Sequence, residues 1–437
     1  MHQSLDRIRK TEYLMILFHT VLFWVTACLV EYTSPHSGFY HFSQFLILYF
    51  GLTLGIYAFR GFDLWRRSHL FHAIMSIFAG TIAGSLPVIP VLILFYRSNI
   101  TKLEMLTILA VIFLGLTIFR TAASVIIYKR APVEKAFVIG NREKWEPVVS
   151  EIAAKLGGKM EIQAYINPTL SQTSDLAPPL PCSILISDPE IYSTPDVNEW
   201  AGRIESRGCS LEYMPQIAED TLGRIPLNVA HAFKNYYNMV FEMTYPHPGQ
   251  RILDLLVAVP ALLLGAVMCL FIIPAIILDS GFPVLFRQPR IGLGGKTFTM
   301  HKFRTMKNHK KGEAAFADGD ADLITPFGAI LRKLRLDEIP QLWDVLRGKM
   351  SIVGPRPEQP EFAAEYAEKI PFYAYRHRLR PGITGWAQIN YRYAASIEDT
   401  KKKLEYDLYY LKNRDALLDI QIILKTAETM LGMRGAK

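Results

Sequence analysis

Two adjacent carboxylates, Asp337 and Glu338, lie in a C-terminal region rich in Arg, Lys, Gly and Pro. An ionised aspartate is an oxygen nucleophile that can attack phosphorus, as in aspartyl-phosphate enzymes. The pair, and Glu338 in particular, can hold Mg²⁺, which proteins bind through one or two carboxylates and substrate phosphates. Because proline is tolerated in a first helical turn, Pro340 predicts a helix beginning near Asp337, where free N–H groups favour the charged carboxylate. In isolation, such a pair is more often a helix cap beside a solvent-facing glutamate.

Basic residues around this pair favour phosphate chemistry. Phosphoryl transfer needs cations around the transferred group and a metal ion between its oxygens. Each arginine alone is more often a surface charge or a lipid-headgroup contact. Several basic and glycine-rich segments together predict a phosphate site, in which tight turns bring backbone N–H groups close to phosphate oxygens. The candidate substrate-binding residues are Lys302, Arg304, Thr305, Arg332, Arg335, Arg356 and Arg380.

The N-terminal part of the chain predicts a membrane-embedded helical bundle. Hydrophobic residues make up 50% of the sequence and form long runs in this part. A span needs roughly 20 apolar residues to cross about 30 Å of hydrocarbon. Four stretches come close to this length: residues 13–31, 43–60, 71–96 and 103–127. Lys and Arg in the flanks, around Arg66 for example, and their absence from residues 31–42 place both termini on the cytoplasmic side.

Residues 133–220 alternate short apolar runs with polar helical stretches, a pattern typical of a small α/β domain with a mainly parallel sheet. Strands are expected at 135–140, 160–166, 182–187 and 209–214, and a helix at 143–156. The turn that begins at Gly140 resembles the start of a nucleotide-binding turn but lacks its further glycines. We therefore expect this Rossmann-like domain to be a scaffold or a dimer contact.

A second long apolar run covers residues 252–278 and is interrupted by Asp254, Pro260 and Pro274. A straight helix of this length would span about 40 Å, but proline removes a backbone hydrogen bond and bends a helix. A helix that bends and returns would keep the following domain on the cytoplasmic side, whereas a fifth span would place it outside. These residues alone leave both topologies open.

The net charge of +8 is compatible with nucleic acid, anionic lipid or a phosphorylated substrate. We find no zinc finger, RNP-like aromatic motif or heptad repeat in the sequence, so a nucleic-acid partner is not expected. The first apolar run lacks a small-residue cleavage site, which predicts an uncleaved anchor. The four cysteines have neither metal-ligand spacing nor a paired pattern, so we expect reduced, buried thiols: Cys28, Cys182, Cys209 and Cys269.

Taken as a set, the motifs of residues 250–434 resemble the bacterial sugar transferase family, the monotopic polyprenyl-phosphate phosphoglycosyl transferases. The segments that carry the resemblance are Arg251–Asp254, Phe286–Gly292, Lys302–Met306, Leu334–Trp343, Ser351–Pro357, Arg380–Gln388, Tyr406–Tyr410 and Leu418–Asp419. The whole chain resembles the long form of this family, which initiates O-antigen, capsule or exopolysaccharide repeat units. Members typically carry a proline, often Ser-Pro, near the middle of the membrane helix, where this sequence has Ala-Val-Met at 266–268.

The resemblance implies a two-step reaction at the cytoplasmic face of the bacterial inner membrane. Asp337 would attack the sugar-bearing phosphorus of a UDP-sugar and release UMP, and undecaprenyl phosphate would then take the hexose-1-phosphate. Glu338 would bind Mg²⁺, while the phosphate or nucleotide contacts would be Lys302, Arg304, Arg356 and Arg380. The resemblance also implies a re-entrant membrane helix and a homodimer. Glucose-1-phosphate and galactose-1-phosphate are the leading groups to be transferred.

We therefore predict a multi-pass membrane protein of three parts. These are an α-helical transmembrane bundle (1–130), a small Rossmann-like α/β domain (131–225) and a mainly α catalytic domain (226–437) with a re-entrant helix at about 252–278. One alternative is a glycosyltransferase acting on lipid carriers, which would release UDP. Another is a membrane scaffold for polysaccharide export.

Overall fold

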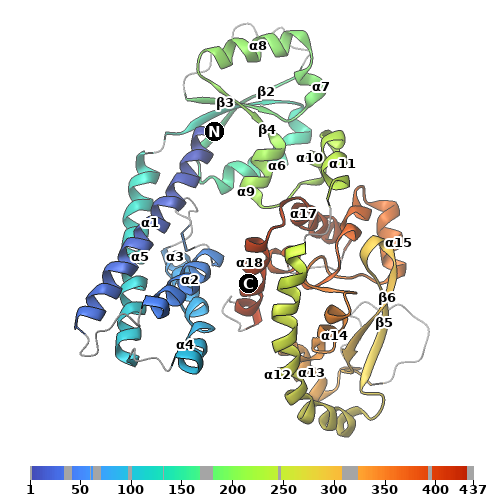
Figure 1. Cartoon of the computed structure of the whole chain (residues 1–437). Coiled ribbons are helices and arrows are strands. Elements are labelled where there is room, and N and C mark those ends of the chain that lie inside the picture. The colour runs from blue at the N-terminus through green and yellow to red at the C-terminus, as the bar shows by residue number, and fades with distance from the viewer. Residues whose placement is uncertain are drawn as a thin grey trace. The chain divides into compact units, whose positions relative to one another are not determined.

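The structure, a computed structural model, describes residues 2–33, 42–59, 61–62, 70–96, 101–130, 132–167, 181–244, 248–307, 323–391 and 396–430. The chain forms two compact units, Met1–Gly223 and Arg224–Lys437 (Figure 1). The first unit contains the N-terminal apolar helices and a parallel sheet, and the second contains the paired carboxylates. The three-part division stays a prediction, and the residues around Arg66 and 34–41, used to predict orientation, lie outside the described residues.

The first unit begins with apolar helices: α1 (His2–Thr33), α2 (Phe42–Ala58), α3 (Leu70–Ser85), α4 (Val88–Tyr96) and α5 (Lys102–Arg130). Within the described residues, three segments of the whole chain are long and apolar enough to cross a membrane: Glu12–Thr33, Leu103–Ile126 and Gly249–Ser280. The predicted stretch 71–96 is not one helix, because the chain turns at Leu86 and Pro87 between α3 and α4. Proline has no N–H to continue a helical hydrogen-bond ladder.

Helices α2 and α3 pack through glycine. A Cβ atom added to Gly55 or Gly84 would overlap the backbone of the other helix. Small residues at such positions allow helix backbones to approach closely, which is a common mode of helix association in membranes. The buried apolar side chains of the bundle, Phe23, Leu48 and Ile112 among them, form one cluster that joins the helices.

The rest of the first unit is a four-stranded parallel sheet in the order β2-β1-β3-β4. Its elements are β1 (Glu134–Ile139), α6 (Arg142–Lys155), β2 (Met160–Ile166), β3 (Cys182–Ile186), α7 (Pro189–Tyr192), α8 (Pro195–Ser206), β4 (Ser210–Tyr213) and α9 (Met214–Leu222). The parallel sheet predicted from the alternating pattern is confirmed. Gly140 has φ of +153°, and a Cβ there would lie 2.6 Å from the Trp145 side chain. A protein side chain therefore occupies the space beside this turn.

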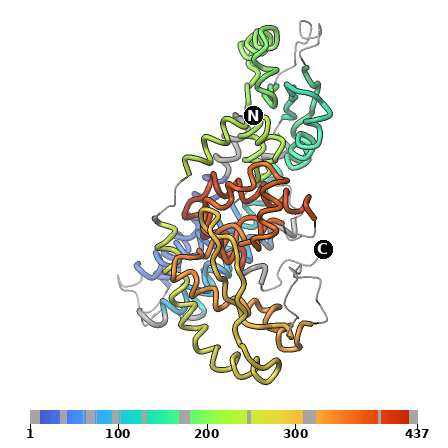
Figure 2. The backbone as a smooth tube through the Cα atoms, turned by 90° about the vertical axis from the view of Figure 1, so that its right-hand side faces the viewer, coloured from blue at the N-terminus to red at the C-terminus, as the bar shows by residue number. Residues whose placement is uncertain are grey.

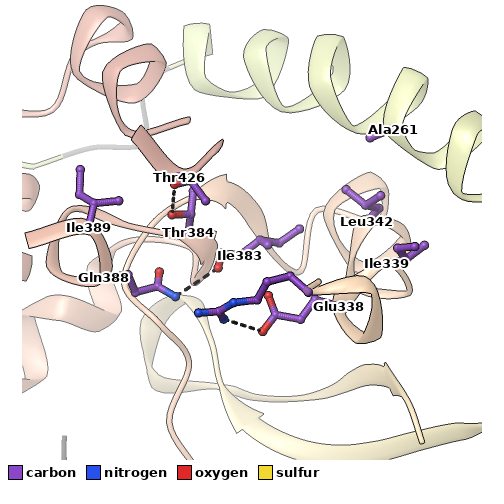
Figure 3. A pocket seen from close by; sticks show the side chains of 10 residues that line it. Ala261, Glu338, Ile339, Leu342, Ile383, Thr384, Gln388, Ile389 and Thr426 are labelled. Atoms are coloured by element: carbon purple, nitrogen blue, oxygen red, sulfur yellow. Dashed lines mark hydrogen bonds and ion pairs between the residues drawn. The ribbon is translucent and has the colours of Figure 1, made fainter. Parts of the chain in front are cut away.

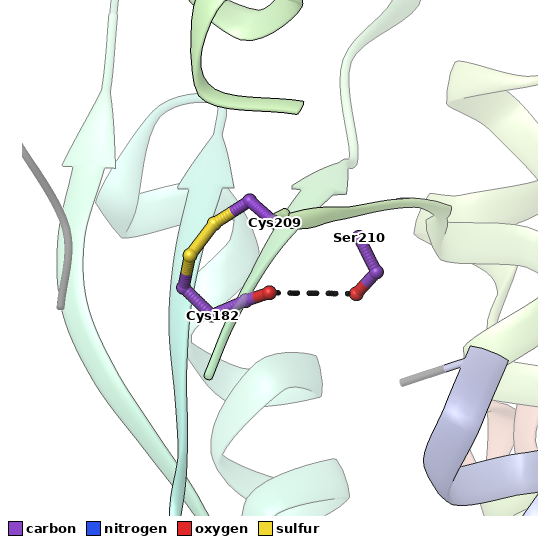
Figure 4. Close-up of a disulfide and its surroundings, with 3 residues drawn as sticks. All are labelled: Cys182, Cys209 and Ser210. Carbon is purple, nitrogen blue, oxygen red and sulfur yellow. Dashed lines mark hydrogen bonds between the residues drawn. A yellow bond between two sulfur atoms is a disulfide. The ribbon is translucent and has the colours of Figure 1, made fainter. Parts of the chain in front are cut away.

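A disulfide joins Cys182 to Cys209 (Figure 4), so the prediction of unpaired thiols is wrong for these two residues. Cys182 begins β3 and Cys209 precedes β4, and the next residues of the two strands, Ser183 and Ser210, are paired in register. The sheet thus places two cysteines 27 residues apart in sequence side by side, with Cα atoms 4.9 Å apart. Cys28 and Cys269 are free thiols, but Cys28 is exposed and Cys269 only partly buried, so the prediction of buried side chains is wrong for these two.

The second unit is mainly helical, as predicted, with short strands. Its helices are α10 (Leu227–Ala232), α11 (Lys234–Glu242), α12 (Pro248–Ser280), α13 (Pro326–Lys333), α14 (Gln341–Leu346), α15 (Pro360–Lys369), α16 (Trp386–Asn390), α17 (Ile397–Asn413) and α18 (Ala416–Met430), with 3-10 turns η2 (Leu293–Gly295), η4 (Leu336–Glu338) and η5 (Tyr373–Arg378). β5 (Leu285–Ile291) and β6 (Thr297–Phe303) form an antiparallel hairpin, and β7 (Ser351–Val353) and β8 (Gly382–Thr384) form a parallel pair.

Helix α12 is continuous over 33 residues and contains both Pro260 and Pro274. Figures 1 and 2 show its later part turned away from the direction of its earlier part. Each proline lacks the N–H that would bond the carbonyl four residues earlier, which favours bending. Near the end of the helix, Ile272 and Ile276 pack with Phe303 and Leu331 of the same unit. The later part of α12 is therefore partly covered by the unit that carries the carboxylates.

Candidate active site

Asp337 and Glu338 lie in the 3-10 turn η4 between α13 and α14, and both side chains are about 8% exposed. The helix predicted to begin near Asp337 is therefore a single 3-10 turn, and the α-helix starts at Gln341. Arg335 precedes the turn in the left-handed region with φ of 58°. This conformation redirects the chain after α13 and ends that helix before the carboxylates.

Glu338 contacts three cations that come from different segments of the chain. Its Oε1 atom lies 3.5 Å from Lys302 Nζ, 3.4 Å from Arg335 Nη1 and 3.4 Å from Arg356 Nη2. Burial alone would raise the pKa of Glu338, but the charges of Arg356, Lys302 and Arg335 outweigh it and lower the pKa. Glu338 is therefore an ionised anchor that holds positive charge beside Asp337.

Asp337 is in a different electrostatic position. Burial raises its pKa, and the neighbouring Glu338 acts in the same direction, while Lys302 and Arg332 oppose them. The pKa of Lys302 is itself lowered by burial and by the charge of Arg356. The ionised form of Asp337 thus depends mainly on Lys302 and Arg332, with a smaller contribution from its own backbone N–H.

Thr305 and Arg332 are linked by a hydrogen bond from Arg332 Nε to Thr305 Oγ1, 2.9 Å long. The backbone carbonyl of Thr305 also accepts the N–H of Thr325, the residue that caps α13. These contacts hold α13 against the end of the β5–β6 hairpin. They keep the Arg332 guanidinium where its charge acts on Asp337.

Arg304 and Arg380 donate to backbone carbonyls. Arg304 is buried and donates to Met306 O at 3.0 Å and to Phe282 O at 2.8 Å. Arg380 Nε donates to Gly348 O at 3.1 Å. The structure therefore gathers Lys302, Arg332, Arg335 and Arg356 around the carboxylates and shows Arg304 and Arg380 holding loops. Substrate contacts by all of these residues stay predictions.

The glycine-rich loops use their N–H groups within the protein. Gly354 N donates to Thr384 O, and Gly382 N donates to Pro355 O, each at 2.9 Å. A Cβ at Gly382 would overlap the backbone of Gly354. These two glycines therefore allow a close approach of two loops, and their N–H groups are not directed at a phosphate as the sequence suggested.

A Mg²⁺ site would need ligands beyond this protein pair. Among the described residues, no group of three or more His, Cys, Asp or Glu side chains is placed to hold a metal ion. All three cations contact Oε1 of Glu338, and within the described residues no hydrogen bond or ion pair reaches Oε2. Carboxylate oxygens completed by substrate phosphates suit Mg²⁺. Asp337 and Glu338 fit such a shared site.

Comparison with known proteins identifies the family of this chain. A family model described as bacterial sugar transferase matches residues 245–433. The sequence is 42% identical over 186 residues to the uncharacterized sugar transferase EpsL of Bacillus subtilis (strain 168), and the match covers 43% of this chain and 89% of that protein. The chain belongs to the bacterial sugar transferase family.

Two longer relatives match over part of their length. The UDP-N-acetylgalactosamine-undecaprenyl-phosphate N-acetylgalactosaminephosphotransferase of Aeromonas hydrophila is 42% identical over 236 residues, 52% of this chain and 55% of that protein. The UDP-glucose:undecaprenyl-phosphate glucose-1-phosphate transferase of Xanthomonas campestris pv. campestris is 42% identical over 187 residues, 42% of this chain and 39% of that protein. The chain thus spans about half the length of the first relative and less of the second.

In this bacterial sugar transferase, two supporting contacts of buried aspartates were not predicted from the sequence. Asp344 is fully buried and accepts hydrogen bonds from His301 Nδ1 at 2.9 Å and from His301 N at 3.1 Å, which fixes α14 to β6 next to Lys302. Arg376 pairs with Asp407 at 2.8 Å and donates to the backbone carbonyl of Arg356 at 3.0 Å. Asp407 lies in Tyr406–Tyr410, one of the segments that carry the family resemblance, whereas for Asp344 the sequence signal was an acid inside an otherwise apolar segment.

Polar side chains also attach the membrane helix α12 to this site. Asp254 accepts hydrogen bonds from Ser351 Oγ at 2.7 Å and from Ile352 N at 2.8 Å. Arg251 donates to the carbonyls of Val345 and Leu346 at 2.6 and 2.7 Å, at the end of α14. The acid that interrupts the apolar run therefore joins α12 to the catalytic part of the unit.

A cleft of about 330 Å³ lies directly beside Glu338 (Figure 3). Its walls come from α12, η4, α14, β8, α16 and α18, and carry both polar and apolar side chains. The lining residues are Ala261, Arg335, Glu338, Ile339, Leu342, Ile383, Thr384, Gln388, Ile389 and Thr426. The cleft connects the surroundings of the carboxylates with the membrane helix.

Proposed function

We propose that this chain transfers a hexose-1-phosphate from a UDP-sugar to undecaprenyl phosphate and releases UMP. This would be the first membrane step in exopolysaccharide, capsule or O-antigen synthesis. The observation that carries the proposal is a buried aspartate, Asp337, beside a glutamate that gathers three cations. The names of the Aeromonas and Xanthomonas relatives share the acceptor, undecaprenyl phosphate, and differ in the UDP-sugar.

In the first step, a carboxylate oxygen of Asp337 attacks the phosphorus that carries the sugar. A phosphorus–oxygen bond to Asp337 forms while the bond between this phosphorus and the oxygen of UMP breaks, and UMP leaves with the electron pair. Lys302, Arg335 and Arg356 stabilise the charge on the transferred group. Their shared anchor, Glu338, holds these cations in place before substrate arrives.

In the second step, a phosphate oxygen of undecaprenyl phosphate attacks the same phosphorus. The bond to Asp337 breaks, and the carboxylate leaves with its electron pair, ready for another cycle. Because no proton enters or leaves in either step, Asp337 has to be ionised before the donor reacts. The cations that oppose the effect of burial on its pKa serve this purpose.

Asp337 and Glu338 would hold Mg²⁺ together with phosphate oxygens of the donor, and the ion would neutralise charge on those phosphates. Support comes from Oε2 of Glu338, which the described cations leave uncontacted. Lys302 reaches the same carboxylate from β6 and would share the donor phosphates.

We further propose that α12 enters the cytoplasmic leaflet and returns, so that the site faces cytosolic UDP-sugars. The two prolines and the bend of α12 support this topology. Four N-terminal spans in the bacterial inner membrane, a Rossmann-like middle domain and a homodimer complete the proposed arrangement.

Trapping the covalent adduct tests the proposal. Full-length protein in detergent is mixed with a UDP-sugar without acceptor, and intact mass and released nucleotide are measured. We expect UMP and a sugar-phosphate adduct on Asp337 for the wild type and for the control D196N, an exposed site in α8. D337N should yield neither. An adduct that persists in D337N, or release of UDP, would contradict the mechanism, and a panel of UDP-sugars would identify the sugar.

A further inference from the structure

We infer that the cleft beside Glu338 binds the acceptor lipid, with the isoprene units nearest the head group inside it and the lipid phosphate at Arg335. This inference rests on the proposed function and assigns the second substrate of the same site. It concerns which residues select a lipid phosphate over other phosphate-bearing acceptors.

The interior of the cleft suits hydrocarbon. Ile339, Leu342 and Ile383 form much of its wall, and Ala261 contributes a small apolar side chain from α12 (Figure 3). The cleft volume, about 330 Å³, lies at the low end of the range for ligand sites. It can therefore take only the part of a long lipid closest to the phosphate.

The chemistry of the cleft edge suits a phosphate. Arg335 and Glu338 both line the cleft, and Glu338 is the neighbour of the proposed nucleophile Asp337. The Arg335 side chain is 51% exposed and contacts Glu338 Oε1 at 3.4 Å. It can therefore turn to a phosphate with little loss of packing, and an anion there would lie close to the group bound to Asp337. A nucleotide is polar along its length and would place polar groups against Ile339, Leu342 and Ile383.

The outer side of the cleft leads to a membrane-facing surface. Ala261 belongs to the helix segment long and apolar enough to cross a membrane. One turn further along α12, the Leu264 side chain is 65% exposed. Ala261 and Leu264 thus offer apolar side chains to a chain that leaves the cleft along α12, as a polyprenyl tail requires. A soluble phosphorylated acceptor would gain nothing from this arrangement.

The test separates the two half-reactions in the full-length protein. Adduct formation is followed by UMP release without acceptor, and decay of the adduct is followed after adding undecaprenyl phosphate. We expect A261F, which fills the cleft, to form the adduct at a rate within about twofold of wild type and to slow its decay about tenfold or more, because overfilling a packed site is costly. I383F, on the opposite wall, should act likewise. L263F makes the same change in side-chain size as I383F at an exposed position of α12 and should change neither step.

Two results would overturn the assignment. If A261F and I383F slow both half-reactions equally, the cleft serves the donor or the fold. If they slow neither, the acceptor lies elsewhere and a bilayer phospholipid is the better occupant. Wild-type protein that transfers sugar-phosphate without any Asp337 adduct would instead refute the proposed function, so the two failures can be told apart.

Discussion

Asp419 offers a quantitative test of the buried polar network in the second unit. Its carboxylate accepts a hydrogen bond of 2.6 Å from the hydroxyl of Tyr410. Burial raises its pKa from the ordinary 3.8 to about 6; Asp254 and Asp415 act in the same direction, while the hydrogen bond from Tyr410 and the charge of Arg414 oppose it. The folded protein therefore keeps this proton over a pH range in which the unfolded chain has lost it.

The sign and size of the effect follow from proton linkage. Below pH 3.8 both states are protonated and the contribution to stability is full. Between the two pKa values the unfolded state binds fewer protons, so the free energy of unfolding falls as pH rises, by about 1.4 kcal/mol per pH unit. Over the interval from 3.8 to about 6 the loss amounts to about 3 kcal/mol.

The variant D419N keeps an oxygen that can accept from Tyr410 but cannot ionise. We expect its stability relative to wild type to improve by about 2.4 kcal/mol between pH 4 and pH 7, or about 5–10 °C in melting temperature for a unit of this size. Thermal unfolding of both proteins in the same detergent measures this difference, and other titrating groups cancel. Y410F, which removes the opposing hydrogen bond, should raise the folded-state pKa of Asp419 further and so extend the loss of stability to higher pH. Parallel melting curves for D419N and wild type across this range would refute the reasoning.

Two further perturbations test the site and the sheet. Replacing Lys302 by Met removes a charge that favours ionised Asp337, so the acid side of the pH–rate profile for UMP release should move to higher pH, whereas K296M on the exposed end of the same hairpin should not move it. An unchanged profile for K302M would show that Asp337 titrates independently of this lysine. Replacing Cys209 by Ser opens a 27-residue loop and should lower the free energy of unfolding of the sheet by about 3.5 kcal/mol, as should reduction of the wild type. C28S should leave that value unchanged, and a reductant that further destabilises C209S would mean that the lost stability lies elsewhere.

The residue types of the site could be predicted from the sequence. Some basic residues directly precede the carboxylate pair, and the others lie in short motifs nearby in the chain. The bonding of Arg304 and Arg380 could not be predicted, since their carbonyl partners, Phe282 and Gly348, are brought near only by tertiary folding. The 3-10 turn at Asp337 was missed for a local reason: Arg335 adopts a left-handed conformation that its residue type does not announce.

The fold shows the same division between local and long-range information. The alternation of short apolar runs with polar helical stretches was enough to predict the parallel sheet, because a strand buried on both faces, such as β3, is a largely apolar run. The disulfide could not be predicted, since only the order of β3 and β4 places Cys182 opposite Cys209. The break at Pro87 was not predicted, because residues 71–96 together are apolar and long enough for one membrane span.

The attachment of α12 to the site has a consequence for the depth of the reaction. Arg251 and Asp254 bind backbone groups at the end of α14 and in β7, so sliding or rotating the helix would break several buried hydrogen bonds together. On the proposed topology, the level at which the helix settles among the headgroups therefore sets the level of the reacting phosphorus. The reacting phosphorus could then reach the phosphate of the lipid carrier without the carrier leaving the bilayer surface. A change in bilayer thickness would change the depth of the nucleophile.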